Sequence, residues 1–345
     1  MEPDLGAQVL SERALNRALL ARQGLLEPLA GDPVEVLERI GPLQAQNWAA
    51  PPVGLWARTG RKAELTPALE GRRLLYGTLL RGTLHLVSAA QYPSYAAVVE
   101  ASGARAQPQF EPLRQALLEF AAEPRTQPEL VDFVEGWVTG HGGKIDAAEL
   151  ARQRQYRWRP LLRWHALVRA PEGRRSEHRA LAAPVAPAQW PDSDTALRDV
   201  VRLHLQAFGP AAADDVAQWI GFKTPPVRAA LEGLDLERFE DERGRRLFDL
   251  ADAPRPHPET PAPPRLLPWF DNVVLAYAPA NRGRILPDAY RDRVYVRANL
   301  QWLPLLLLDG MVAGTWGPKT GLKLFIKANK ADAAALQRLL AECPA

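Results

Sequence analysis

Residues 195–248 read TALRDVVRLHLQAFGPAAADDVAQWIGFKTPPVRAALEGLDLERFEDERGRRLF, and their pattern decides the fold class. Apolar residues recur at helical spacing until Gly209 and Pro210, a pair that ends a helix. Gly221 ends a second helix, and Gly244 lies between two short apolar segments, as in a two-stranded wing. The predicted elements are three helices and a β-ribbon, at residues 195–208, 213–220, 225–231, 236–239 and 246–248. This is the element order of a winged helix.

The same order of elements occurs twice before this stretch. Helical patterns precede an alternating or basic ribbon at residues 8–23, 33–40, 66–77 and 78–87, and again at 108–122, 127–138, 146–164 and 166–179. We therefore predict an α+β protein with three tandem winged-helix units, from repeated architecture alone because no strict residue repeat is present. The predicted regions are winged helix 1 at 1–104, a basic winged helix 2 at 105–190, winged helix 3 at 191–253, a linker at 254–268 and a β-rich region at 269–345.

The end of the chain changes character. Residues 254–268 hold seven prolines, which favour an extended linker. Beyond it the pattern predicts strands and one closing helix, at residues 273–277, 294–296, 305–308, 311–316, 322–326 and 331–340. Asp309-Gly310 is a strong two-residue hairpin signal. The C-terminal region is thus predicted to be a small β-sheet or barrel with one helix.

Composition excludes several classes of protein. The 345 residues are 47% hydrophobic and 24% charged, which is typical of a globular chain, and the net charge is +3. We find no run of 18 apolar residues and no basic leader, so we expect a cytoplasmic protein without a membrane segment. The single cysteine, Cys343, excludes an intramolecular disulfide, and no histidine pair has metal-ligand spacing with acidic or cysteine partners. Phosphate-binding and dinucleotide motifs are missing as well, so we predict neither a metal nor a cofactor.

The stretch GPLQAQNW, which begins at Gly41, holds the candidate catalytic side chains Gln44 and Gln46. Gly41 and the proline after it end a short helix, and Pro51-Pro52 is expected to keep the later backbone out of a helix. On extended backbone, residues i and i+2 point the same way, so the two amides would converge on a water or a sugar oxygen. The alternative is a pair of glutamines that hydrogen-bond the backbone at a helix–loop junction.

Basic residues concentrate between 141 and 180, where ten basic residues accompany four acidic ones. Arg154, Arg157 and Arg159 lie there, interleaved with aromatic residues. Winged-helix units usually lay one helix on DNA, and arginines on that face neutralise phosphates. The alternative is a solvated helix face with aromatic residues in the core.

Two further basic segments are candidates for DNA contact. Arg282 and Arg284 flank a glycine and are interpreted as a basic tip between strands that could enter a groove. The alternative for them is an ordinary solvated turn. Lys319 begins a stripe of C-terminal lysines that forms the third basic surface.

Five short motifs follow one another along the chain: LQAQ at 43–46, LWAR at 55–58, LRGTLH at 80–85, LPWFDN at 267–272 and DGMVAGTW at 309–316. With them the chain resembles, over nearly its whole length, the bacterial winged-helix DNA glycosylases that include AlkZ and YcaQ. The resemblance implies a metal-free enzyme that excises bulky N7-alkylated purines, including interstrand crosslinks, from double-stranded DNA. It maps the catalytic motif onto Gln44, Ala45 and Gln46, which is the AlkZ-like pattern because YcaQ-like members end in Asp. Ala45 is smaller than the usual middle residue.

We also predict substrate-binding side chains around the glutamines. These are Trp48, Arg58, Arg81 and His85, with Arg58 or His85 organising the site and its phosphates. A lone histidine is more often a structural residue, which is the alternative for His85. The segment around Pro279 departs from the family pattern, because it is longer and less acidic than usual, and the role of that hairpin stays open.

The residue types restrict the chemistry. A glutamine amide is neutral and a poor base, so it suffices only where the leaving group is already activated. An N7-alkylated purine is cationic and departs as a neutral base, which suits Gln44 and Gln46. A bulky base is hard to extrude into a pocket, so we expect an open, concave DNA-binding face. We also expect a monomer that is associated with the nucleoid. The competing classes are a transcription regulator and an inactive binder of damaged DNA, because fold does not imply function.

Overall fold

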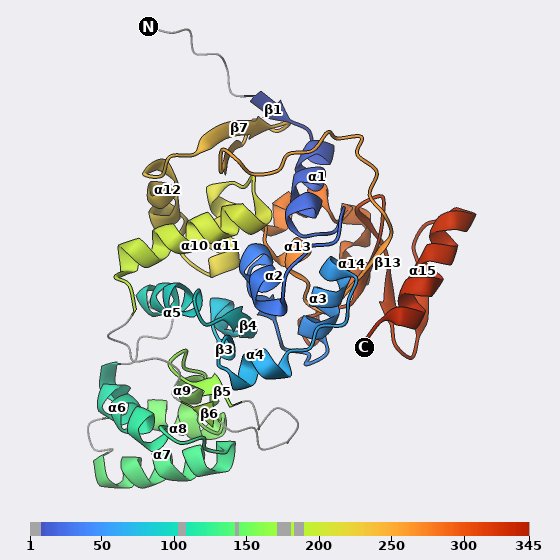
Figure 1. The fold of residues 1–345 in the computed structure, drawn as a ribbon. Helices are drawn as coiled ribbons and strands as arrows, with labels where there is room; N and C mark the ends of the chain where they lie inside the picture. Colours follow the sequence, from blue (N-terminus) through green and yellow to red (C-terminus); the bar gives the residue numbers. More distant parts are fainter. Residues whose placement is uncertain (1–7, 103–107, 142–144, 171–180, 183–189, 345) are drawn as a thin grey trace, which may run out of the picture. The chain divides into compact units, whose positions relative to one another are not determined.

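Figure 1 shows the fold of the protein in a computed structural model, which describes residues 8–102, 108–141, 145–170, 181–182 and 190–344. The chain divides into a first unit, Met1–Leu65 with Leu197–Ala345, and a second unit, Thr66–Ala196. Helices and small, mainly antiparallel sheets occur in both units, which confirms the predicted α+β class. The three winged-helix boundaries stay a prediction. Among the described helices, none is long and apolar enough to cross a membrane.

The second unit consists of helices beside a small antiparallel sheet. Its elements are α4 (Thr66–Glu70), β3 (Leu74–Thr78), η1 (Leu80–Gly82), β4 (Leu84–Ser88), α5 (Tyr92–Ala101), η2 (Pro108–Phe110), α6 (Glu111–Phe120), α7 (Gln127–His141), α8 (Ala147–Gln155), α9 (Arg159–Leu162), β5 (Val168–Arg169) and β6 (Leu181–Ala182). Strands of this unit lie in the order β4-β3-β5-β6. Helices α6 to α9 enclose a core that includes Phe110, Leu117, Val134 and Trp158, because their apolar residues recur on one face.

The elements predicted between residues 195 and 248 are present, and all of them except the start of α10 belong to the first unit. They are α10 (Ser193–Phe208), α11 (Ala213–Ile220), α12 (Thr224–Glu232), β7 (Glu237–Asp241) and β8 (Arg246–Asp249). The ribbon gains a third strand, β1 (Gln8–Leu10), which pairs parallel with β7. The helix predicted from residue 8 therefore begins later, as α1 (Glu12–Arg22), because the Ser11 hydroxyl caps it by accepting from the Ala14 N–H at 3.1 Å.

The glutamine segment follows α2 (Pro33–Ile40), includes β2 (Leu43–Gln44) and leads into α3 (Ala50–Thr59). Asp32 caps α2, because its carboxylate accepts from the second and third backbone N–H groups of the helix. The expectation that Pro51-Pro52 excludes a helix is wrong. Both prolines lie in the first turn of α3, where a missing N–H costs no hydrogen bond and the proline φ is already helical.

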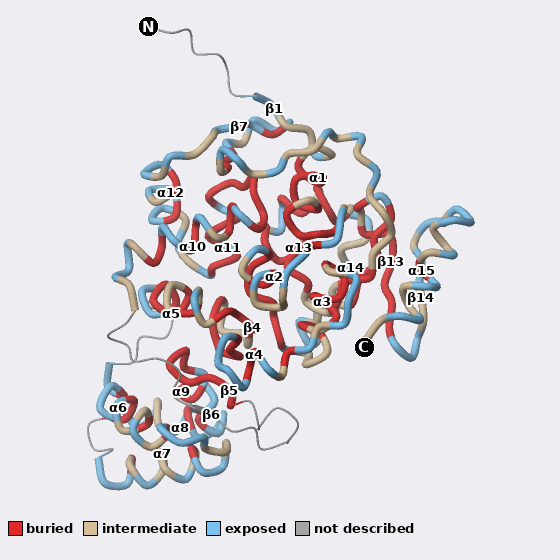
Figure 2. Tube along the Cα trace, viewed as in Figure 1, coloured by how far each residue is buried: buried red, intermediate tan, exposed pale blue. Residues whose placement is uncertain are grey.

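The rest of the first unit is the C-terminal region. Its elements are β9 (Arg265–Leu267), α13 (Asn272–Leu275), η6 (Pro279–Arg284), η7 (Asp288–Tyr290), α14 (Arg291–Val294), β10 (Tyr295–Val296), β11 (Gln301–Trp302), β12 (Leu305–Leu308), β13 (Met311–Gly317), β14 (Gly321–Leu324) and α15 (Lys330–Glu342). The main sheet has the antiparallel order β14-β13-β12-β9. Figure 2 shows that β13 is largely buried whereas α15 is mostly exposed.

In this region one prediction from a local sequence signal is confirmed and another is wrong. Asp309 and Gly310 both have left-handed φ, 43° and 77°, and join β12 to β13 in the hairpin that the sequence predicts. The strand predicted at residues 273–277 is wrong, because this segment begins with helix α13. The Asp271 carboxylate caps that helix by accepting from the Val273 N–H at 3.0 Å.

Candidate active site

Gln44 and Gln46 lie on the short connection between α2 and α3. Gly41 ends α2 with φ of 81°, a conformation that favours glycine, and its N–H donates to the Leu37 carbonyl. Gln44 closes β2 and is only 7% exposed, whereas Gln46 lies in a bend and is exposed. Extended backbone was predicted for both residues, but only Gln44 lies in a strand. The convergence of the two amides stays a prediction.

Two buried amide side chains hold the backbone that leads into β2. Gln23, the C-cap of α1, donates from Nε2 to the Ile40 carbonyl at 3.0 Å and to the Ala207 carbonyl at 2.9 Å. Asn272 donates from Nδ2 to the Pro42 carbonyl at 2.8 Å. The carbonyl groups on both sides of Gly41 are therefore fixed, so the entry to the glutamine segment is rigid.

A buried ion pair supports the same amides. The Arg58 guanidinium on α3 binds the Asp271 carboxylate through two hydrogen bonds, of 3.0 and 2.9 Å, and both side chains are completely buried. Arg58 also donates to the Gln23 side-chain carbonyl at 3.1 and 2.9 Å and to the Gly54 carbonyl. Four acceptor oxygens, from three groups inside the protein, thus occupy the guanidinium. The substrate contact predicted for Arg58 is replaced by a positioning role.

Trp48 lies in the turn before α3. The Asn47 side chain accepts from the Ala49 N–H at 2.9 Å, which shapes this turn. Trp48 is half-buried and lies two residues after Gln46. The contact predicted between Trp48 and the substrate stays a prediction.

His85 and Arg81 belong to the second unit. The His85 ring is buried and donates from Nδ1 to the Thr83 carbonyl at 2.9 Å. Burial, aided by the charge of Arg81, lowers the pKa of His85 to about 3. A neutral histidine cannot attract phosphate as a cation, so the role proposed for His85 in organising phosphates loses its electrostatic basis. Arg81 is half-buried, within η1, at a left-handed φ of 52°.

The predicted basic surface on the second unit is exposed, but its arginines differ. Arg154 is bound to Glu135 at 2.8 Å, which partly neutralises it. Arg157 and Arg159 are exposed, and neither has an ion-pair partner within the described ranges of the chain. In the first unit, Lys319 is exposed in the turn between β13 and β14.

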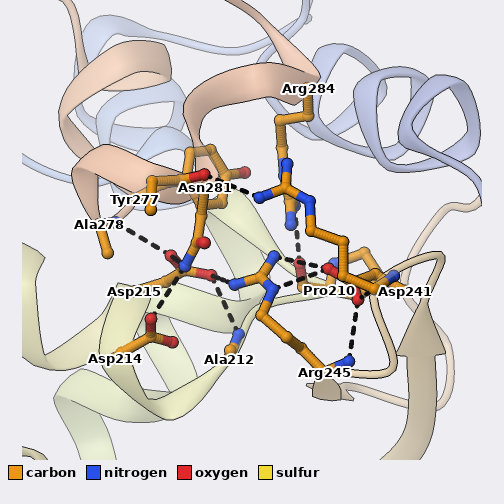
Figure 3. Close-up of polar contacts among 12 residues, drawn as sticks. Pro210, Ala212, Asp214, Asp215, Asp241, Arg245, Tyr277, Ala278, Asn281 and Arg284 are labelled. Atoms are coloured by element: carbon orange, nitrogen blue, oxygen red, sulfur yellow. Dashed lines mark hydrogen bonds and ion pairs between the residues drawn. The ribbon is translucent and has the colours of Figure 1, made fainter.

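Arg282 and Arg284 do not form the exposed tip between strands that the sequence predicts. Residues 279–284 form η6, and Figure 3 shows Arg284 in a polar cluster with Asp215 and Asn281. Arg284 donates to the Pro210 carbonyl at 2.8 Å, and burial lowers the pKa of Arg282 to about 10. The prediction of an exposed tip is therefore wrong, because Arg284 is buried against Tyr277 and Arg282 against Trp302.

The same cluster contains a carboxylate that is structural. Asp215 accepts from the Asn281 amide at 2.7 Å and from the Ala278 N–H at 2.9 Å, and Figure 3 shows both contacts. Burial raises its pKa, opposed by the charge of Arg284. Across the described residues, no group of three or more His, Cys, Asp or Glu side chains is placed to hold a metal ion.

Sequence reasoning missed the polar residues behind the glutamines. Asp271 and Asn272 belong to a quoted motif but received no role, although a polar pair beside a run of apolar residues is a usable signal. Gln23 carries no such signal, because its partners lie 17, 35 and 184 residues away.

Comparison with known proteins places this geometry in context. A family model described as "DNA glycosylase AlkZ-like" matches residues 37–343. The "Interstrand DNA cross-link repair glycosylase" of Streptomyces sahachiroi is 24% identical over 321 residues, which span 84% of this chain and 82% of that protein. The solved structure of "Streptomyces sahachiroi DNA glycosylase AlkZ" has the same fold, with a TM-score of 0.81, 19% identity and 97% coverage of both chains.

Proposed function

The chain belongs to the AlkZ-like DNA glycosylase family, and from that premise we propose that it hydrolyses the N-glycosidic bond of N7-alkylated purines in double-stranded DNA. One observation carries the proposal: Gln44 and Gln46 follow a backbone whose Ile40 and Pro42 carbonyls are held by the buried amides of Gln23 and Asn272. A fixed entry to the matched motif supports a pair of amides that orients a water.

The proposed reaction suits neutral side chains. Water attacks C1′ of the deoxyribose while the bond from C1′ to N9 breaks. The bonding electrons enter the cationic purine and neutralise it, and the water loses a proton to solvent. The products are a free alkylated purine and an abasic site. The amide carbonyls of Gln44 and Gln46 accept hydrogen bonds from the attacking water and stabilise the positive charge that develops on the sugar.

The neutrality of the two glutamine side chains also sets the selectivity of the enzyme for alkylated purines. Gln44 is 7% exposed, and a carboxylate at such a position would lose most of its hydration. Without a strong base or a general acid, the site accelerates only departures that need no proton on the leaving base. Undamaged purines are neutral and leave poorly, so the enzyme spares them.

The substrate range extends to bulky lesions. The relative from Streptomyces sahachiroi is named for repair of interstrand crosslinks. A guanine that is crosslinked through N7 is cationic, like a monoadduct, and thus has the same activated leaving group. We propose that this chain acts on both kinds of lesion.

The test uses a duplex with a single 7-methylguanine, excess enzyme, and alkaline cleavage of the abasic product. Gln44→Ala and Gln46→Ala should each abolish excision and keep affinity for undamaged duplex. Gln218→Ala, at an exposed position of α11, is the matched control and should excise at the wild-type rate. Wild-type excision by both active-site variants refutes the proposed site. A wild-type protein that forms no abasic sites but prefers one DNA sequence favours a transcription regulator.

A further inference from the structure

The turn between α8 and α9 has an unusual backbone. Arg157 and Trp158 are consecutive non-glycine residues with left-handed φ values of 51° and 59°. L-amino acids rarely adopt this conformation, and two in succession persist only where the surroundings enforce them. We call residues 156–159 the α8–α9 tip.

Contacts on the inner side of the turn hold it in place. Trp158 is buried, donates from its indole N–H to Glu135 at 2.7 Å and packs edge-on against Phe110. The backbone N–H of Trp158 donates to the Gln153 carbonyl at 2.8 Å, and the backbone N–H of Arg159 donates to the Tyr156 carbonyl at 3.1 Å. The α8–α9 tip is therefore a rigid turn anchored by one buried aromatic side chain.

The outer side of the turn carries different chemistry. Tyr156 is 53% exposed, and Arg157 and Arg159 are exposed on either side of the anchor. In the described part of the chain neither arginine has a carboxylate partner, whereas Arg152, on the same helix, is bound to Glu149 at 2.7 Å. Two uncompensated cations and an exposed aromatic ring thus share one rigid turn.

We propose that the α8–α9 tip is a separate contact for the backbone of duplex DNA. Arg157 and Arg159 bind phosphates, to which the guanidinium group is matched in shape, and Tyr156 packs against the neighbouring deoxyribose. Because the turn is already fixed, little backbone freedom is lost on binding. The inference rests on the proposed function only for the identity of DNA as partner, since the tip contacts the backbone whether or not a lesion is present.

The experiment measures binding of the full-length protein to an undamaged 20-base-pair duplex at several potassium chloride concentrations. We use Arg157→Asn, because asparagine tolerates the left-handed backbone, and Arg159→Gln. Each variant should reduce the slope of log K against log salt by about 0.9. Arg152→Gln, which removes a paired charge from the same helix, is the control and should leave the slope unchanged. Tyr156→Ala should weaken binding without changing the slope, and Tyr156→Phe should bind as wild type.

Two results overturn the proposal. One is an unchanged slope in both arginine variants. The other is a loss of affinity for a single-stranded 20-mer with no change for the duplex, which indicates a site for unpaired nucleic acid. Gln44→Ala should lose excision of 7-methylguanine and keep the wild-type salt slope, whereas Arg152→Gln should keep both. If the wild-type protein shows no excision but its arginine variants reduce the salt slope, only the proposed function fails. If it excises but the arginine variants leave the slope unchanged, only the proposal for the α8–α9 tip fails.

Discussion

Asp271→Asn should destabilise the first unit far more than its single-atom change suggests. In the wild type, Asp271 and Arg58 form a completely buried pair with hydrogen bonds of 3.0 and 2.9 Å. The variant keeps the shape but leaves the guanidinium buried without a counter-charge, which costs about 3–5 kcal/mol. A unit of roughly 200 residues loses about 2–4 °C of Tm for each kcal/mol, so thermal unfolding followed by circular dichroism should move down by about 10 °C.

The matched control applies the same change to an exposed pair. Asp292 binds Arg297 at 2.8 Å, with the two side chains 76% and 78% exposed. Solvent screens that pair, so Asp292→Asn should lower Tm by less than about 3 °C. Equal Tm values for Asp271→Asn and Asp292→Asn would refute the argument from burial.

A double variant separates stability from positioning. Arg58→Met combined with Asp271→Asn removes the unpaired buried charge, so Tm should recover by at least half of the loss. Single-turnover excision by the double variant should stay below the wild-type rate, because the Gln23 side-chain carbonyl loses the Arg58 donors that hold it at 2.9 and 3.1 Å. Recovery of single-turnover excision together with Tm would show that the ion pair acts through stability alone.

Three further changes test other parts of the structure. Asn272→Asp replaces the donor to the Pro42 carbonyl by a carboxylate oxygen, and should slow single-turnover excision by about tenfold or more with duplex affinity intact. Gly77→Ala would place a methyl group 2.5 Å from the Tyr92 ring, so urea unfolding should show a loss of about 1–3 kcal/mol. Burial lowers the pKa of His204 to about 3, below its unfolded value of about 6.5, so the unfolded state takes up the proton first and stability falls from pH 6.5 towards pH 3. His204→Gln should lessen that dependence by about 1.4 kcal/mol per pH unit in the same window, measured by unfolding at each pH.

The sequence by itself determined the elements whose signals are local. The helices and ribbon between residues 195 and 248 follow from apolar spacing and glycine stops, and the Asp309-Gly310 hairpin follows from two residues that tolerate left-handed φ. Errors arose where a local signal permits two outcomes. Pro51-Pro52 can end a helix or begin one, and apolar residues 273–277 suit a strand until Asp271 caps a helix there.

Only the tertiary structure decided which polar residues meet. Arg58 and Asp271 are 213 residues apart, and Gln23 reaches its carbonyl partners across 17 and 184 residues. Burial depends on all elements packed around a side chain, so spacing within one element cannot reveal it. For that reason Arg58 was predicted as a substrate-binding residue and Arg282 as a DNA contact at an exposed tip, and both are instead buried inside the first unit. The glutamine motif was visible in the sequence, whereas the buried network that holds its segment exists only in the folded chain.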